Sequence, residues 1–255
     1  MGTAMPMPLL RPRNPALVVA GIFAGLVALA TPFAAAELVA YWVEPDGADL
    51  LRSEVATGQP ETVAADRPGM LGIAIDPVAR VVYATDPVAG RIASIPFSGG
   101  PAESVVTGLT SPYSLAFDAT EQCLYWAAPD RIQRAPVATG AVEDVVMGLN
   151  DPVGIALDLD GGYVYWSEMV GQRIRRAPMA GGSVEDIVTG LDSPYGIAYA
   201  EGILYWADWR DGRIQRAWIS SGVVEDLATG LDHPVGVAID AVNGRIYWTD
   251  TQGVQ

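Results

Sequence analysis

Arg245-Ile246-Tyr247-Trp248-Thr249-Asp250 is the clearest copy of a short motif that recurs, with substitutions, along the chain. The second aromatic position of this motif falls at residues 42, 84, 126, 166, 206 and 248. Five of these positions hold tryptophan, namely Trp42, Trp126, Trp166, Trp206 and Trp248. A repeat of about 40 residues predicts a propeller or a solenoid, in which similar units pack side by side.

Each repeat contains four short apolar runs separated by turn residues. A Gly-Ile-Ala-Ile-Asp-like run comes before the aromatic pair, and an Ile-x-Arg run follows it. The last run is Val-Glu-Asp-Val-Val-like and is clearest at Val142–Leu149 and Val184–Leu191. Runs rich in Val, Ile and Tyr between turns indicate strands, and four strands per repeat make one propeller blade. We therefore expect an all-β propeller with four-stranded blades.

The repeated motifs resemble those of a known family. They are the aromatic-pair motif, the Pro-x-Gly-Ile-Ala run and the Ile-x-Arg-Ala run (Pro152–Ala156, Pro194–Ala198, Ile132–Ala135, Ile174–Ala177 and Ile214–Ala217). From Leu38 to Asp250 the chain resembles the YWTD propeller, the low-density lipoprotein receptor class B repeat. The resemblance implies a six-bladed propeller that binds protein ligands at its top face.

The strand count leaves the closure of the ring open. Four complete repeats start at Gly72, Ser114, Gly154 and Gly196, with three strands expected before them and two after them. That makes 21 strands, whereas six four-stranded blades need 24 and five need 20. We expect blades cut to six-fold wedges in an incomplete or imperfectly closed ring, with five-bladed closure as the alternative.

The first 36 residues differ in character from the repeats. Arg11 and Arg13 precede a continuous apolar run at Ala16–Ala30, and Ala34-Ala35-Ala36 ends the segment. This layout is typical of a secretory signal peptide that is cleaved after Ala36, leaving a propeller domain over residues 37–255. The protein is then secreted or periplasmic. An uncleaved leader would instead be a membrane anchor.

The charge of the chain is strongly acidic. It has 30 Asp and Glu against 15 basic residues, and a formal net charge of −15. Such a charge disfavours binding to nucleic acid and to anionic membrane surfaces, and it favours basic partners. No motif implies a cofactor, and the oligomeric state stays open.

Loops at the top face are the predicted binding site. They join strand four to strand one and strand two to strand three of the blades. One loop contains Trp209 and Arg210, which depart from the repeat and have the composition of an interface hot spot. The alternative is that Trp209 folds back over its blade and Arg210 pairs with a carboxylate. The predicted ligand-binding residues are Trp209, Arg210, Asp211, Tyr113, Tyr195, His233 and Asp151.

Acidic residues occupy the last motif position in most repeats (Asp86, Asp208, Asp250, Glu44 and Glu168). A ring of carboxylates could bind a cation. Repetition in nearly every blade instead indicates a structural role, in which each carboxylate accepts turn N–H groups or pairs with the repeated Arg134, Arg176 and Arg216. The motif residues Trp42, Trp126, Trp166, Trp206, Trp248, Asp86, Asp208 and Asp250 are therefore predicted to be structural, with no metal site.

Two functions follow from these features. The first is a secreted, non-catalytic propeller that binds a protein or peptide ligand, or serves as a scaffold. The second is a propeller hydrolase or lyase that uses His233 and acidic top-face residues. His233 is the only histidine, and it replaces Ser111, Asp151 and Ser193 of the other repeats. A turn role is therefore favoured for it, and no catalytic residue is predicted.

Overall fold

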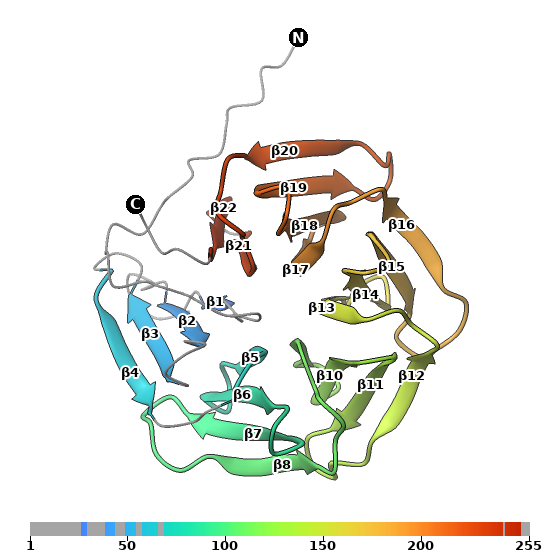
Figure 1. Cartoon of the computed structure of the whole chain (residues 1–255). Helices are drawn as coiled ribbons and strands as arrows, with labels where there is room; N and C mark the ends of the chain where they lie inside the picture. The colour runs from blue at the N-terminus through green and yellow to red at the C-terminus, as the bar shows by residue number, and fades with distance from the viewer. Residues whose placement is uncertain are drawn as a thin grey trace.

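The computed structural model describes residues 27–29, 39–43, 49–54, 58–65, 69–241 and 243–250. These residues form an all-β propeller whose sheets stand around a central axis (Figure 1). Five sheets have four antiparallel strands each, and a further sheet has two. The structure therefore has five complete blades. Six-fold wedges were expected from the sequence, with five-bladed closure as the alternative.

The strands of the complete blades follow one another in chain order. The first two blades contain β1 Val27–Leu29, β2 Val39–Val43, β3 Leu50–Glu54, β4 Pro60–Ala64, β5 Ile73–Asp76, β6 Val81–Asp86, β7 Arg91–Pro96 and β8 Glu103–Thr107. The third and fourth contain β9 Leu115–Asp118, β10 Cys123–Ala128, β11 Arg131–Pro136, β12 Glu143–Met147, β13 Pro152–Asp158, β14 Tyr163–Glu168, β15 Arg173–Pro178 and β16 Glu185–Thr189. The fifth contains β17 Pro194–Ala200, β18 Ile203–Asp208, β19 Arg213–Trp218 and β20 Val224–Ala228.

The two-stranded sheet consists of β21 Val237–Asp240 and β22 Arg245–Trp248. Strand β21 contacts β17 of the fifth blade on one side and β1 of the first blade on the other. Strand β1 also contacts β5, so the inner strands complete a ring around the axis (Figure 1). The two-stranded sheet therefore fills the interval between the fifth blade and the first.

Strand β1 was not predicted. It lies inside the segment expected to be a leader, and its backbone pairs with β2 in the register Val27↔Tyr41. The 22 strands of the described residues exceed the expected 21 by this one strand. The rest of the predicted leader, and Glu44 of the acidic motif positions, lie outside the described residues.

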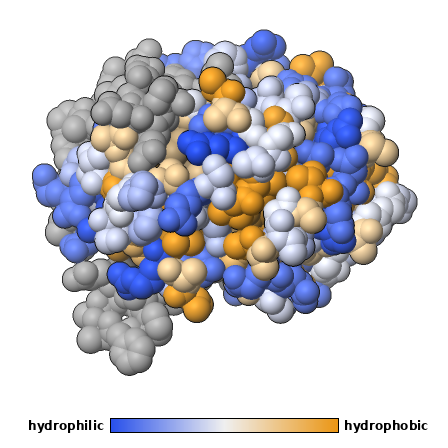
Figure 2. Space-filling model, turned by 90° about the horizontal axis from the view of Figure 1, so that it is seen from below, coloured by the Kyte–Doolittle hydropathy of each residue, from blue (hydrophilic) through white to orange (hydrophobic). Residues whose placement is uncertain are grey.

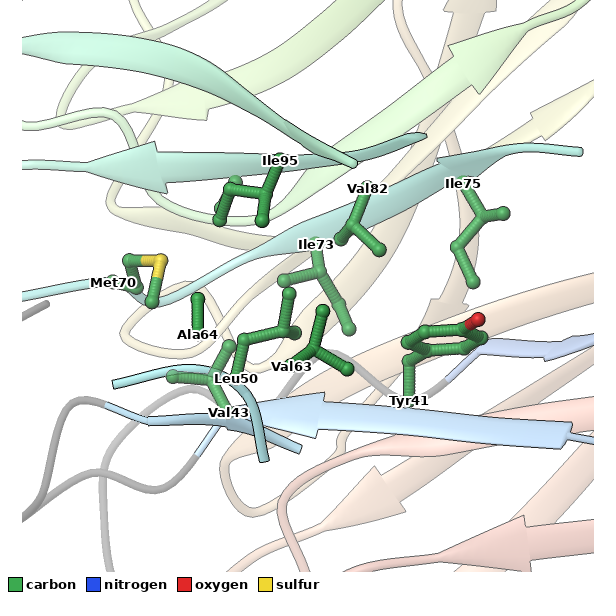
Figure 3. Close-up of a cluster of buried hydrophobic side chains, with 11 residues drawn as sticks. Tyr41, Val43, Leu50, Val63, Ala64, Met70, Ile73, Ile75, Val82 and Ile95 are labelled. Atoms are coloured by element: carbon green, nitrogen blue, oxygen red, sulfur yellow. The ribbon is translucent and has the colours of Figure 1, made fainter. Parts of the chain in front are cut away.

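The aromatic pairs of the motif pack between blades. Successive side chains of a strand point to opposite faces, so the Tyr and Trp of one pair contact different neighbours. Trp166 packs with Tyr125 of the preceding blade, and Tyr165 packs with Ile197 of the following blade. Trp126, Trp166 and Trp206 are fully buried. Figure 3 shows the equivalent interface between the first two blades, where Tyr41, Leu50 and Val63 meet Ile73, Val82 and Ile95.

The outermost strands carry the charges of the repeat. The residues Glu143, Glu185 and Glu225 pair with Arg134, Arg176 and Arg216 of the adjacent strand at 2.8 to 2.9 Å. The last carboxylate of the motif was expected to accept turn N–H groups or to pair with these arginines, and the arginines pair instead with the glutamates of strand four. The register places each arginine opposite a glutamate, several residues from the motif carboxylate. In the side view of Figure 2, hydrophobic residues lie among hydrophilic ones on the outer surface.

Candidate functional site

The two sets of predicted top-face loops lie against each other. In each complete blade from the second to the fifth, a leucine N–H of the loop after strand four donates to a carbonyl of the loop after strand two. The four bonds are Leu109 to Gly90 at 2.8 Å, Leu149 to Asp130 at 2.8 Å, Leu191 to Gln172 at 3.1 Å and Leu231 to Gly212 at 3.0 Å. Residues far apart in the sequence are thereby brought to one face of the ring.

A left-handed residue recurs in the loops that lead into strand one. It is Ser111 (φ 42°), Asp151 (φ 56°), Ser193 (φ 117°) and His233 (φ 52°). Asp and His adopt this conformation more readily than most residues with a Cβ. The backbone of His233 is therefore left-handed, like that of the equivalent residues in the other repeats. This conformation agrees with a turn role for His233.

Three aromatic side chains meet on this face. The ring of Trp209 lies 6.3 Å from that of Tyr195 and 4.4 Å from that of His233, measured between centroids. Tyr195 is buried with Val153 and Val235, and Met169 and Trp209 pack against this group. We call Tyr195, Trp209 and His233 the aromatic cluster. Tyr195 lies near the start of β17, and Trp209 and His233 lie in the loops after β18 and after β20.

Asp151 and Tyr113 lie beside the aromatic cluster. Burial, followed by the negative charge of Asp151, raises the pKa of Tyr195 to about 12. The same two causes raise the pKa of Tyr113. Burial also raises the pKa of Asp151 itself. Because the charge of Asp151 acts on both tyrosines, these three side chains lie near one another.

Five of the seven predicted binding residues are therefore brought together, and two are not. Arg210 is exposed and pairs with Asp192, with 3.3 Å between Nη1 and Oδ1. Asp211 lies 3.6 Å from the guanidinium of Arg213. These two residues belong to the outer part of the loop. Trp209 packs back onto Tyr195, so the alternative arrangement of this loop is the one that the structure has.

The acidic motif residues accept backbone N–H groups or pair with arginines of strand three. Asp86 accepts a hydrogen bond from the Ala89 N–H at 2.8 Å, and Asp208 accepts one from the Asp192 N–H at 3.0 Å. Glu168 is fully buried and pairs with Arg173 at 2.8 Å and with Arg175 at 3.2 Å. Among the described residues, no group of three or more His, Cys, Asp or Glu is placed to hold a metal ion.

The axis of the ring contains a cavity of about 340 Å³. It is lined by the inner strands, including Ile73, Leu115, Ile155, Ile197 and Val237, and none of its described lining residues is charged. This cavity was not predicted from the sequence. The packing of Met169 beside Tyr195 and the pairing of Asp192 with Arg210 were also not predicted. Met169 had a signal, since it stands at the same loop position as Trp209 one blade earlier.

No family model matches the chain, and no curated protein matches it in sequence. Solved structures match its fold. A nidogen/laminin complex has 20% identity and a TM-score of 0.73, covering 89% of this chain and 84% of that chain. A gluconolactonase from Xanthomonas campestris has 15% identity and a TM-score of 0.77, covering 93% and 86%. A streptogramin B lyase has 16% identity and a TM-score of 0.67, covering 89% and 76%.

The likeness is one of fold. The propeller predicted from the YWTD resemblance is confirmed by the structure and by these neighbours. Proteins that share a fold at such low identity carry different functions, so each neighbour's activity belongs to that neighbour.

Proposed function

We propose that this propeller binds a protein or peptide ligand through the top-face region made of the aromatic cluster, Tyr113 and Asp151. The observation that carries the proposal is the convergence of residues that the repeat does not require. A repeat protein keeps similar packing residues in every unit, because each unit has similar neighbours. Side chains that depart from the repeat and still meet at one place are available to serve a partner.

The chemistry of this region favours a ligand with both apolar and basic groups. Trp209, Tyr195 and Met169 offer partly or largely buried apolar surface. Asp151 places a negative charge near Tyr195 and Tyr113, and the whole chain is acidic. Aromatic side chains flanked by charged groups are frequent anchors of protein interfaces. The nidogen/laminin complex, which has a similar fold, agrees with a role in protein binding.

The competing function is hydrolysis or elimination at the same face, by analogy with the lactonase and lyase neighbours. Such chemistry needs His233 and a carboxylate of a second blade to converge on one reacting atom. In the structure, His233 contacts Asp232, its neighbour in the sequence, and packs on the ring of Trp209. Because His233 contacts its own neighbour and Trp209, and no described carboxylate of a second blade, we favour binding over catalysis.

The binding proposal is tested by selecting a random peptide library against the whole chain and measuring the affinity of the selected peptides. Trp209→Ala is expected to weaken binding about thirtyfold, which corresponds to about 2 kcal/mol. Trp218→Ala is the matched control, since Trp218 lies at the opposite end of its blade under Arg216, 4.3 Å from the guanidinium carbon. Equal effects of the two variants, or selected peptides without basic residues, would argue against the proposed site.

We further propose that the protein is exported and cleaved after Ala36, on the pattern of its first 36 residues. Cleavage would remove β1, which is the inner strand of the first blade. N-terminal sequencing of secreted protein is expected to start at Glu37. A secreted chain that still begins at Met1 would mean that the segment is retained. In the described part of the chain, no helix is long and apolar enough to cross a membrane.

A further inference from the structure

The cavity on the axis has a wall made of equivalent residues from five inner strands, β5, β9, β13, β17 and β21. Two large residues of each strand line it, with an alanine between them. The upper tier is Ile73, Leu115, Ile155, Ile197 and Val237, and the lower tier is Ile75, Phe117, Leu157, Tyr199 and Ile239. Because the repeat places similar residues in every strand, the wall is aliphatic or aromatic on all five sides.

The wall is neutral, although the chain as a whole is strongly acidic. Four of the five strands end in a buried aspartate that directly follows the lower tier, namely Asp76, Asp118, Asp158 and Asp240. Each of these carboxylates accepts a hydrogen bond from an N–H of the following turn, donated by Val78, Thr120, Gly161 and Asn243 at 2.8 to 3.1 Å. The turns therefore hold these charges, and none of the described lining residues is charged.

The two ends of the cavity differ. At the top, the residues directly before two of the lining glycines are Tyr195 and Val235, which are buried and pack with Val153. At the opposite face, Leu159 lies in the turn after β13, lines the cavity and is 46% exposed. Most of the lower tier is only half-buried. The cavity is thus covered at the top and reaches the surface at the opposite face.

The wall also carries hydrogen-bonding groups. Among the described residues, each inner strand pairs in its sheet with strand two of its own blade only, and its other edge is turned toward the axis (Figure 1). Burial, followed by a hydrogen bond with Asp158, raises the pKa of Tyr199 to about 12, so its phenol is neutral. An apolar wall with a few backbone groups that orient the ligand is the usual composition of a small-molecule pocket.

The volume of the cavity limits what it can hold. An apolar cavity of about 150 Å³ holds benzene, and the axial cavity, with about 340 Å³, has more than twice that volume. An ion would lose its hydration without gaining a charged partner from this wall. A folded partner cannot enter, because the blades enclose the sides. These limits leave a small, uncharged molecule.

We propose that the axial cavity binds a neutral small molecule with a largely apolar body, roughly the size of two joined aromatic rings, which enters at the face opposite the top-face site. The body of this ligand contacts the two tiers. A hydroxyl, carbonyl or amide group on it bonds to the free backbone edges. The site shares no lining residue with the top-face region, so the two proposals are independent.

The probe is the neutral dye N-phenyl-1-naphthylamine, whose fluorescence increases in apolar surroundings. We expect a saturable increase with one dye bound per chain. Anilinonaphthalenesulfonate has the same rings with an added sulfonate, and it should bind at least about tenfold more weakly. The reason is that the wall offers no cation to the sulfonate, and the chain has a net charge of −15.

Two variants of the wall test where the dye binds. Leu157→Asn places an amide in the lower tier and should weaken dye binding about tenfold. Leu227→Asn is the matched control, since Leu227 is a half-buried leucine of the outermost strand β20, and it should leave the affinity unchanged. Leu159→Asn changes an exposed residue at the mouth, so it should not disturb folding, and about threefold weaker binding is expected.

The top-face variant separates this site from the proposed peptide site. Trp209→Ala should leave dye affinity unchanged, and Leu157→Asn should leave the affinity of selected peptides unchanged. The proposal is overturned if the dye shows no saturable binding, which would mean that the cavity holds water. It is also overturned if Leu157→Asn and Leu227→Asn weaken binding equally, or if Trp209→Ala abolishes dye binding, which would place the dye on the aromatic cluster.

Discussion

The hydroxyl of Ser167 joins two blades, because it donates a 2.5 Å hydrogen bond to the carbonyl oxygen of Tyr195 in the next blade and accepts a 2.8 Å bond from the N–H of Gly154 in its own. Thr85 makes the same two contacts, with Tyr113 and Gly72. Only glycine fits at position 154, since a Cβ there would collide with the Tyr195 carbonyl. The third motif position thus links neighbouring inner strands at their closest approach.

Removal of this hydroxyl should destabilise the ring. Ser167→Ala is expected to lower the free energy of unfolding by about 1–3 kcal/mol, because two buried backbone groups lose a partner. Ser167→Thr is the control and should keep most of the stability, since Thr85 and Thr249 occupy the same position in other repeats. Urea unfolding of both variants measures the difference. If Ser167→Thr lost the same free energy of unfolding, the effect would come from packing around residue 167 and not from its hydrogen bonds.

The tryptophans of the motif should differ in their contribution to stability. Trp126 is fully buried against Ile92 and Val106 of the preceding blade, and Trp126→Ala should cost about 3–5 kcal/mol. Trp248 is only partly buried, so Trp248→Ala should cost at most about 2 kcal/mol. Equilibrium unfolding compares the two. A loss below about 1 kcal/mol for Trp126→Ala would show that its ring does not fill a core.

Asp208 should make the stability of the fold depend on pH. It is buried, and this burial raises its pKa above the value of 3.8 expected in the unfolded chain. The folded protein therefore binds more protons between these two pKa values, and the free energy of unfolding falls as the pH rises through that window.

Asp208→Asn removes this titration and can still accept the hydrogen bond of Asp192. Its stability relative to the original chain should therefore increase from low pH to neutral pH. Urea unfolding at several pH values between about 3 and 7 measures the change. A stability difference that is the same at every pH would contradict the raised pKa of Asp208.

His233 should tolerate replacement by a residue that accepts the same backbone. Asn adopts left-handed conformations readily, so His233→Asn is expected to leave the melting temperature nearly unchanged. His233→Val, which disfavours this conformation, should lower the melting temperature. If His233→Asn instead abolished a hydrolytic or eliminating activity while the fold stayed intact, the enzymatic alternative would replace the binding proposal.

Much of the fold could be predicted from the sequence because a repeat protein repeats its local packing. The spacing of Trp126, Trp166 and Trp206 indicated the blades, and the four apolar runs of each repeat indicated the strands. The motif carboxylates were expected to accept turn N–H groups or to pair with Arg134, Arg176 and Arg216, and the sequence did not decide between the two. Strand register places a glutamate of strand four opposite each of these arginines.

The sequence by itself determined the class of fold, the four strands of each blade, and which loop residues depart from the repeat. These properties are local, since hydrophobic periodicity and turn residues act over a few neighbours along the chain. Only the tertiary structure decided that β1 joins the first blade, that Trp209 meets Tyr195 and His233, and that the hydroxyl of Tyr247 is buried without a partner. Each of these depends on how strands and loops pack in three dimensions, and this packing brings together residues whose separation along the chain carries no information about their contact.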